Sequence, residues 1–270
     1  MSFAEVTDGP LLVSEPVPGV AELRLNRPER LNALDPGLLE QLRQALDVIA
    51  EDARIRCVLL TGTGRGFCAG FDLDELGKTW ESGLPELLTA QEGWAGACGR
   101  LVDLKVPAIA VVTGPAVGAG MSLALAADLR VVTPAASFGA AFVRVGLAGA
   151  DLGLSWTLPR TVGMGLAAEI MLTGRHVDGE EAHRIGLANR LCTEEAAVPV
   201  ALDLATAIAA NSPFGVRLTK QALHAGVDAP SFAAAAEIEN RNQLLASRTE
   251  DMAEAFHALR ASRKPTFRNR

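Results

Sequence analysis

The chain has 270 residues, 49% of them hydrophobic, and is therefore long enough to bury one large core. Its formal net charge of −7 argues against nucleic acid as a main partner. No apolar run approaches the roughly 20 residues of a membrane span. The first residues, Met1-Ser2-Phe3-Ala4-Glu5, form no secretory signal, so we expect a cytoplasmic protein without a membrane partner.

The cysteines are scattered along the chain and form no Cys-x-x-Cys pair. They are Cys57, Cys68, Cys98 and Cys192. Zinc sites and disulfide frameworks use paired or regularly spaced cysteines. We therefore expect neither a metal site nor a disulfide framework in this protein.

The N-terminal half of the chain alternates short strands with helices. Two apolar runs separated by Pro16-Val17-Pro18-Gly19 predict a hairpin, and Asp35-Pro36 has the form of an N-cap followed by a proline in the first helical turn. Such alternation favours a mainly parallel sheet with right-handed crossovers. The predicted strands cover residues 11–15, 20–25, 57–61, 108–112, 129–133 and 137–138, the predicted helices cover 36–50, 94–104 and 120–127, and residues 77–93 are expected to be irregular or loosely helical.

From Gly153 onward the predicted elements are almost all helices. This part of the chain is rich in alanine, whose small side chain allows close helix packing within a subunit or between subunits. The predicted helices cover residues 157–162, 165–173, 179–184, 194–211, 213–225, 231–246 and 249–263.

Two glycine-rich turns, each following a predicted buried strand, carry the main functional signal. One is Gly118-Ala119-Gly120, which opens an apolar helix, and the other lies within residues 62–73. The first N–H groups of a helix have no helical partner, and small residues let a ligand approach them closely. Two such turns side by side would form an oxyanion hole, which stabilises negative charge on a carbonyl oxygen. The alternative is that both are ordinary strand-to-helix turns.

The glycines at positions 62, 64 and 66 suggest a second, weaker alternative. A glycine-rich turn after a strand also occurs in nicotinamide-dependent oxidoreductases. Here the glycine spacing departs from that pattern, and no acidic residue ends a following strand. The opening hairpin also argues against a dinucleotide-binding fold.

Taken together, the motifs resemble the crotonase superfamily, also called the enoyl-CoA hydratase/isomerase family, over nearly the whole chain. Each motif is short, but their order and spacing are specific. The matching pieces are Leu25-Asn26-Arg27-Pro28, Asn32-Ala33-Leu34, residues 67–73, residues 107–128, Phe138, Leu172-Thr173-Gly174-Arg175, residues 182–187 and Asn211-Ser212-Pro213.

The resemblance implies an α/β fold, a crotonase-type spiral of ββα repeats with a C-terminal helical trimerisation region. We expect the spiral core in residues 1–200 and the helical region in residues 201–270. The implied assembly is a homotrimer or a dimer of trimers. The implied substrate is an acyl-CoA thioester, with no cofactor beyond the coenzyme A that the substrate itself carries.

The resemblance also assigns site residues by position. The oxyanion-hole N–H groups are those of Phe71 and Ala119, where Ala119 replaces the middle glycine of the family's usual three. Asp72 also fits a simpler role as the N-cap of a helix that begins at Leu73. The residues expected to bind coenzyme A or the acyl group are Leu31, Ala33, Ala69, Gly70, Asp72, Leu73, Gly118, Phe142, Lys264 and Phe267, the last two from the same or a neighbouring subunit.

The two glutamates of the family's hydratases are absent from this chain. Their positions hold Ser122 and Phe142. One acid, Asp151, matches the aspartate of dienoyl-CoA isomerases and the nucleophile of 4-chlorobenzoyl-CoA dehalogenase, although the supporting residues of both enzymes are missing. If it is buried, its raised pKa would suit it to carry a proton. The alternative role for Asp151 is as N-cap of the helix that starts near Gly153.

These observations leave two main functions open. The first is an enzyme of acyl-CoA metabolism that works through an enolate, with isomerase-like proton transfer by Asp151. The second is a non-catalytic acyl-CoA binding protein on the same scaffold, since binding energy alone does not make a catalyst.

Overall fold

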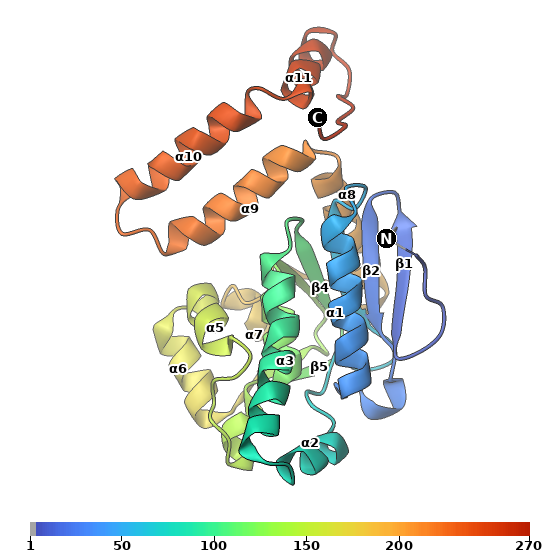
Figure 1. Cartoon of the computed structure of the whole chain (residues 1–270), viewed down its shortest axis with the longest axis vertical. Coiled ribbons are helices and arrows are strands. Elements are labelled where there is room, and N and C mark those ends of the chain that lie inside the picture. The colour runs from blue at the N-terminus through green and yellow to red at the C-terminus, as the bar shows by residue number, and fades with distance from the viewer. Residues whose placement is uncertain (1–3) are drawn as a thin grey trace.

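The computed structural model describes residues 4–270, which form a mixed α/β fold (Figure 1). Its main sheet has six strands in the order β1-β2-β3-β4-β6-β9, with β1 antiparallel to β2 and the other pairs parallel. These strands are β1 (Leu11–Val17), β2 (Val20–Leu25), β3 (Cys57–Gly62), β4 (Ala108–Val112), β6 (Leu129–Val132) and β9 (Arg190–Leu191).

A second, smaller sheet lies beyond the carboxyl ends of β3 and β4. It contains the short strands β5 (Pro115–Val117), β7 (Ser137–Gly139) and β8 (His176–Asp178) in that order. A single bridge between Cys68 and Ala116 attaches the loop after β3 to this sheet. Successive turns of the chain therefore contribute first to the large sheet and then to the small one, as expected for a spiral.

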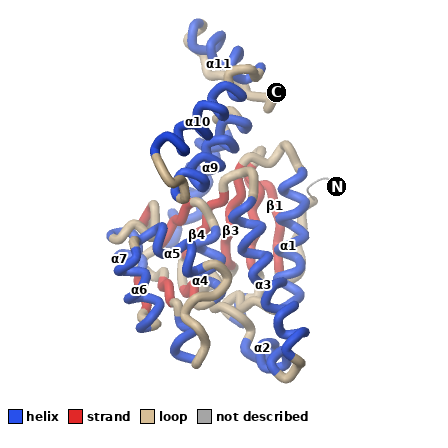
Figure 2. Tube along the Cα trace, turned by 60° about the vertical axis from the view of Figure 1, so that its left-hand side comes forward, coloured by secondary structure: helices blue, strands red, loops and turns tan. Residues whose placement is uncertain are grey.

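The helices cover both faces of the main sheet, and the last three lie away from it (Figures 1 and 2). Two short 3-10 helices, Pro28–Arg30 and Ala141–Val145, occupy loops. The α-helices are α1 (Pro36–Glu51), α2 (Leu73–Trp80), α3 (Leu84–Asp103), α4 (Ala119–Ala126), α5 (Leu154–Val162), α6 (Met164–Thr173), α7 (Gly179–Arg184), α8 (Glu194–Ala209), α9 (Pro213–Val227), α10 (Phe232–Ala246) and α11 (Glu250–Arg260).

Strands β3 and β4 are buried on both faces, which explains why their sequences are continuously apolar. Val58 and Leu60 point into the larger core, formed with α1 and α3. Cys57 and Leu59 point to the opposite face, where α8 packs on the sheet. The face of α8 that meets the sheet is a stripe of small residues at four-residue spacing, namely Ala197, Ala201, Ala205 and Ala209. Small side chains at this spacing allow close approach of helix and sheet.

The packing places the start of the C-terminal helical region after α8. The predicted division between residues 200 and 201 falls inside α8, whose second half still covers the sheet. The helices that leave the sheet are α9, α10 and α11 (Figures 1 and 2). Helix α9 is attached to the body through Lys220, which donates to the Asp128 carboxylate at 2.8 Å and to the Val106 carbonyl at 3.2 Å.

Several predicted elements differ from the observed ones. Of the two possibilities for residues 77–93, irregular or loosely helical, the structure supports the helical one, because α2 and the 20-residue α3 occupy most of the segment. Helix α5 begins at Leu154, three residues before the predicted start. The short strands β5, β8 and β9 were not predicted, because strands of two or three residues carry no periodic signal of their own. The predicted N-cap at Asp35 is confirmed, since its carboxylate accepts from the Leu38 N–H at 2.7 Å.

No single helix in residues 4–270 has the length and apolarity to span a membrane; α8 and α9 meet that criterion only as a pair, and they are bent by 106° at their junction.

Candidate active site

The two glycine-rich turns lie side by side, held by main-chain hydrogen bonds. The N–H groups of Phe67 and Cys68 donate to the Pro115 carbonyl at 3.0 and 2.9 Å, and the Val117 N–H donates to the Cys68 carbonyl at 3.0 Å. This ladder joins the loop after β3 to β5, which leads directly into α4. The prediction that the two turns face each other is therefore confirmed.

The approach of the two turns depends on glycines at two positions. A Cβ on Gly120 would lie 2.0 Å from the Cys68 carbonyl oxygen, so no side chain fits there. Gly70 has a φ of +99°, and a Cβ on it would lie 2.8 Å from the Val117 oxygen and 3.6 Å from the Ala119 nitrogen. The residue before Phe71 therefore lies within a few ångströms of the Ala119 amide.

The Phe71 N–H is available to a ligand. Its two neighbours pair with Leu34, since the Leu34 N–H donates to the Gly70 carbonyl at 2.7 Å and the Asp72 N–H donates to the Leu34 carbonyl at 2.9 Å. In a parallel bridge of this kind the N–H of the central residue points away from the partner. Within residues 4–270 this N–H has no hydrogen-bond acceptor.

The second amide of the pair belongs to Ala119, the first residue of α4. An N–H at this position has no partner inside its helix and lies at the positive end of the helix dipole. Gly118 precedes it, with a φ of +55° and its own N–H bound to the Gly139 carbonyl at 2.8 Å. The structure thus brings the predicted pair of amides, those of Phe71 and Ala119, close together.

Two hollows meet at Phe71. The first, of about 360 Å³, is lined by Ala33, Ala69, Asp72 and Leu73, four of the residues that were assigned to coenzyme A binding. It also includes Arg30 and Asp74, which form an ion pair at 3.3 Å and which the sequence analysis did not single out. Among the described residues that line this hollow, Arg30 is the cation and Asp72 and Asp74 are carboxylates, so a phosphate would compete with Asp74 for the Arg30 guanidinium.

The second hollow, also about 360 Å³, is apolar. Among the residues of the described chain that line it, Asp151 alone is ionisable, and Gln91 is the other polar side chain. Phe142 lies in its wall and also faces Gly118, with a ring carbon 3.5 Å from the position of a Cβ there. The remaining lining residues are Phe71, Leu76, Trp80, Leu84, Leu87, Leu88, Trp94, Leu147, Ala148 and Ala150.

Asp151 is partly buried and does not cap a helix. The N-cap of α5 is Gly153, so the alternative role predicted for Asp151 is wrong. Its Oδ1 accepts hydrogen bonds from the Leu152 N–H at 2.8 Å and from the Gln91 amide at 2.5 Å. Burial raises the pKa of Asp151, against the lowering effect of the Leu152 and Gln91 hydrogen bonds. A raised pKa is expected for a carboxyl group that carries a proton.

The side chain of Ser122, which occupies the position of a family glutamate, binds the main chain of Asp151. Its buried hydroxyl donates to the Asp151 carbonyl at 3.1 Å. The Ser122 hydroxyl therefore helps to hold the main chain of Asp151 in place.

Asp72 caps α2, as its alternative role predicted. Its carboxylate accepts from the Asp74 N–H at 3.1 Å and from Arg27 at 2.9 Å. Burial by itself would raise the pKa of Asp72, but the Arg27 and Asp74 hydrogen bonds outweigh it and lower the pKa. This carboxylate is thus engaged in holding the turn that presents the Phe71 amide.

Three of the residues assigned to coenzyme A binding lie elsewhere. Leu31 does not line either hollow but accepts the Ala69 N–H at 3.0 Å, which orders the loop. The C-terminal tail, which contains Lys264 and Phe267, is attached to the opposite end of β3, where Arg56 donates to the Phe267 carbonyl at 2.9 Å. Within one chain, therefore, neither Lys264 nor Phe267 reaches the hole.

The buried cysteine nearest the hole is not poised as a nucleophile. Burial raises the pKa of Cys68 to about 12, which keeps it a neutral thiol. Within residues 4–270 no three side chains among His, Cys, Asp and Glu are grouped in a way that could hold a metal ion.

Gln91, which contacts Asp151, was not singled out in the sequence. It lies in the segment that was expected to be irregular or loosely helical, 60 positions before Asp151. A signal was present, because Pro85 near the start and apolar residues at helical spacing predict a helix through this segment.

Comparison with known proteins matches this geometry to a family. The model of the enoyl-CoA hydratase/isomerase family matches residues 16–270. A Mycobacterium bovis protein named as a probable enoyl-CoA hydratase is 40% identical over 266 residues, covering 95% of this chain and 92% of that protein. The 1,2-epoxyphenylacetyl-CoA isomerase of Escherichia coli strain K12 is 36% identical over 250 residues, covering 92% of this chain and 95% of that enzyme.

Comparison with solved structures indicates the same family. The enoyl-CoA hydratase of Bacillus anthracis superimposes with a TM-score of 0.92 at 30% identity, covering 97% of this chain and all of that one. The α/β fold predicted from the sequence is therefore confirmed, and the dinucleotide-dependent oxidoreductase is excluded as an alternative. From its turns, its two hollows and these matches, the chain belongs to the enoyl-CoA hydratase/isomerase family.

Proposed function

We propose that this enzyme is an isomerase of enoyl-CoA thioesters, in which Asp151 carries a proton from one carbon of the acyl chain to another. The observation that carries the proposal is that Asp151 and Phe71 line the same apolar hollow, where Asp151 is the ionisable residue among those described. The absence of both hydratase glutamates, replaced by Ser122 and Phe142, argues against the usual activation of water.

The reaction needs only groups that this chain supplies. The Asp151 carboxylate takes a proton from C2 of a 3-enoyl thioester, and the electron pair of the C–H bond moves into a dienolate. The N–H groups of Phe71 and Ala119 stabilise the negative thioester oxygen. Protonated Asp151 then returns the proton at C4, which shifts the double bond to C2–C3 and restores the carboxylate.

The lining of the second hollow indicates an uncharged, apolar acyl group. Apart from Gln91 and Asp151 it consists of aliphatic and aromatic side chains, so a charged acyl group would lose hydration there without gaining a partner. The name of the Escherichia coli relative, 1,2-epoxyphenylacetyl-CoA isomerase, supports both the reaction class and the inclusion of ring-bearing acyl groups among the candidates.

The other candidate function is a non-catalytic acyl-CoA binding protein. It shares the hollows and the oxyanion hole, but it gives no role to the raised pKa of Asp151 or to the two donors that hold its carboxylate. We therefore favour the enzyme.

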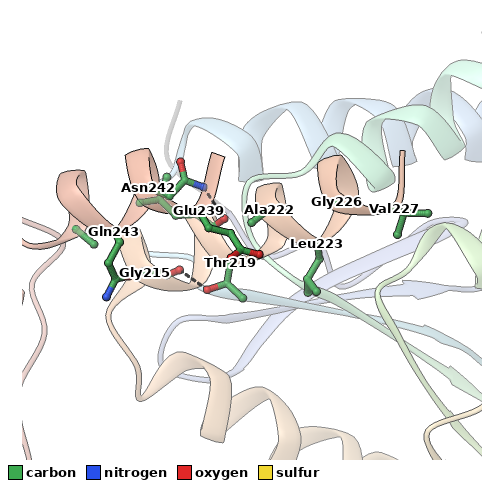
Figure 3. A pocket seen from close by; sticks show the side chains of 11 residues that line it. Gly215, Thr219, Ala222, Leu223, Gly226, Val227, Glu239, Asn242 and Gln243 are labelled. Carbon is green, nitrogen blue, oxygen red and sulfur yellow. Dashed lines mark hydrogen bonds between the residues drawn. The ribbon is translucent and has the colours of Figure 1, made fainter. Parts of the chain in front are cut away.

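We also propose that the chain assembles as a homotrimer or a dimer of trimers through α9, α10 and α11. Helices α9 and α10 enclose a hollow of about 700 Å³, into which Thr219 and Glu239 project, and Asn242 links the helices by donating to the Leu218 carbonyl at 3.2 Å (Figure 3). Large apolar side chains of this region are exposed in the single chain, among them Phe232, Leu223, Leu244 and Leu259. Such a concentration is typical of an interface.

The assembly would also give Lys264 and Phe267 a route to the coenzyme A of a neighbouring copy. Sedimentation equilibrium should give three or six times the 28.3 kDa chain mass. A monomer at micromolar concentration would contradict this part of the proposal.

The experiment that tests the reaction is deuterium incorporation from heavy water at C2 and C4 of a panel of 2-enoyl- and 3-enoyl-CoA thioesters. The wild type should exchange these positions and interconvert the isomers. Asp151→Asn should lower both rates by about 10² to 10⁴ while retaining affinity for the thioester. Binding without exchange in the wild type would favour the binding protein instead.

A further inference from the structure

The two hydrogen bonds to the Asp151 carboxylate fall on the same oxygen. The Leu152 N–H and the Gln91 side-chain amide both donate to Oδ1, at 2.8 and 2.5 Å. Within residues 4–270 no donor is bound to Oδ2. A carboxylate held in this way has one oxygen engaged and one oxygen free to exchange a proton with a ligand in the hollow.

The main chain around Asp151 is also fixed, so the position from which its side chain extends is set. Leu152 adopts a φ of +50°, which residues other than glycine rarely adopt. The Asp151 carbonyl accepts from the Ser122 hydroxyl at 3.1 Å and from the Leu154 N–H at 2.9 Å. The remaining freedom is the rotation of the carboxylate group about its own bond. Gln91 is the side chain that donates a hydrogen bond to this group.

Gln91 is well placed for this role because α3 also positions the hole. Trp94, three residues later on the same helix, packs against the Phe71 ring with centroids 4.5 Å apart. Residues three apart on a helix share a face. The face of α3 that meets the hollow therefore touches both the residue that supplies an oxyanion N–H and the acid.

We propose that Gln91 is a positioning residue that engages Oδ1 of Asp151 and thereby assigns proton transfer to Oδ2. The proposal rests on the function proposed above for Asp151, and it adds that this function needs a neutral hydrogen-bond donor from α3. Gln91 itself neither gains nor loses a proton.

Other titratable groups do not account for the state of Asp151. Cys98, also on α3, interacts electrostatically with the Asp151 carboxylate. Burial raises the pKa of this thiol to about 12, so it stays neutral. The influences on Asp151 are burial, the Leu152 N–H and Gln91, with no charged side chain among them. A substitution at position 91 should therefore change the pKa of Asp151.

The test uses two substitutions with opposite effects on that titration. Gln91→Met keeps the length of the side chain and removes the donor, whereas Gln91→Lys supplies a charged donor. The pH dependence of kcat/KM is measured with the isomer pair that the wild type converts best, together with kcat and KM at neutral pH. The matched control is Gln44→Met, because Gln44 on α1 also donates to a carboxylate, that of Glu40, but is exposed and lies outside the hollow.

With Gln91→Met, kcat should fall between about tenfold and a hundredfold with little change in KM, because the acid loses its orientation. The acidic limb of the pH profile should move to higher pH in Gln91→Met and to lower pH in Gln91→Lys, while Gln44→Met leaves it in place. Opposite shifts of this kind would not follow from a change in packing alone.

Two results would overturn the proposal, and they are distinguishable. If Asp151→Asn is inactive but the limb stays in place in both Gln91 variants, the positioning role is wrong and the proposed function stands. If Asp151→Asn retains full exchange, the proposed function fails and the positioning role fails with it.

Discussion

The guanidinium of Arg27 donates from Nη2 to Oδ2 of the buried Asp72 at 2.9 Å, and so fastens the segment before α1 to the residue that follows Phe71. The same guanidinium donates to the Ala33 carbonyl at 2.6 Å. One side chain thus holds two residues that line the first hollow, Ala33 and Asp72, and Asp72 directly follows Phe71.

Arg27→Met should lower the free energy of unfolding by about 3–5 kcal/mol, because it leaves a buried carboxylate without its partner. Urea denaturation with the linear extrapolation gives this quantity. The pKa of Asp72 is lowered in the folded state, so the stabilisation is present above the unfolded pKa near 3.8 and is lost as the pH falls. Asp72→Asn should flatten this acid dependence, and an unchanged dependence would show that another carboxylate causes it.

Gly120→Ala should destabilise the protein by about 1–3 kcal/mol or more and impair the oxyanion hole, because the new Cβ would meet the Cys68 carbonyl oxygen at 2.0 Å. The control is Gly165→Ala in α6, where a Cβ has open space. That substitution should be neutral or stabilising by up to about 1 kcal/mol. Thermal melts and exchange assays on both variants check the contrast, and equal stability of the two would contradict it.

Asp151→Asn should make the protein as stable as the wild type or more stable at neutral pH. The folded state raises the pKa of Asp151 through burial, so ionising this group costs folding stability. By linkage, the stability it contributes is complete below the unfolded pKa near 3.8 and is lost as the pH rises through the folded pKa. Melting temperatures at acidic and neutral pH measure the difference, and a large loss of stability in the variant at neutral pH would oppose this account.

Lys220→Met should loosen α9 from the body, because the buried ammonium bridges Asp128 and the Val106 carbonyl. The expected cost is about 3 kcal/mol or more, since Asp128 would remain without its main cationic partner. Amide hydrogen exchange should accelerate in α9 more than in β3. The matched control is Lys78→Met, whose exposed pair with Glu75 is screened by solvent, so its loss should change stability far less.

Phe142→Ala should shift specificity toward larger acyl groups, because the buried ring forms part of the wall of the second hollow. Each methylene that the enlarged hollow accommodates can change the preference by about tenfold or more in kcat/KM. The substitution should also cost about 3–5 kcal/mol of stability. Ala150→Leu, on the same wall, should shift specificity toward smaller groups, and parallel shifts in the two variants would argue that the acyl group lies elsewhere.

Much of the fold was predictable from local patterns. The strands β3 and β4 carry continuous apolar runs, because both faces of the sheet are covered. The N-cap at Asp35 and the turn at Gly118-Ala119-Gly120 were predicted from residue types that favour the start of a helix and a tight turn. The family resemblance also came from short-range motifs in a fixed order, and so did the predictions of an oxyanion pair at Phe71 and Ala119 and of Asp151 as the candidate acid.

The tertiary structure alone decided the contacts between distant segments. The free direction of the Phe71 N–H depends on its pairing with Leu34, and the two donors on Asp151 Oδ1 come from the adjacent residue and from α3. Strands as short as β5 and β8 exist only because a neighbour supplies their hydrogen bonds. A local pattern records the backbone preference and the buried face of a segment, whereas the partner of a particular N–H or carboxylate oxygen depends on how the whole chain is packed.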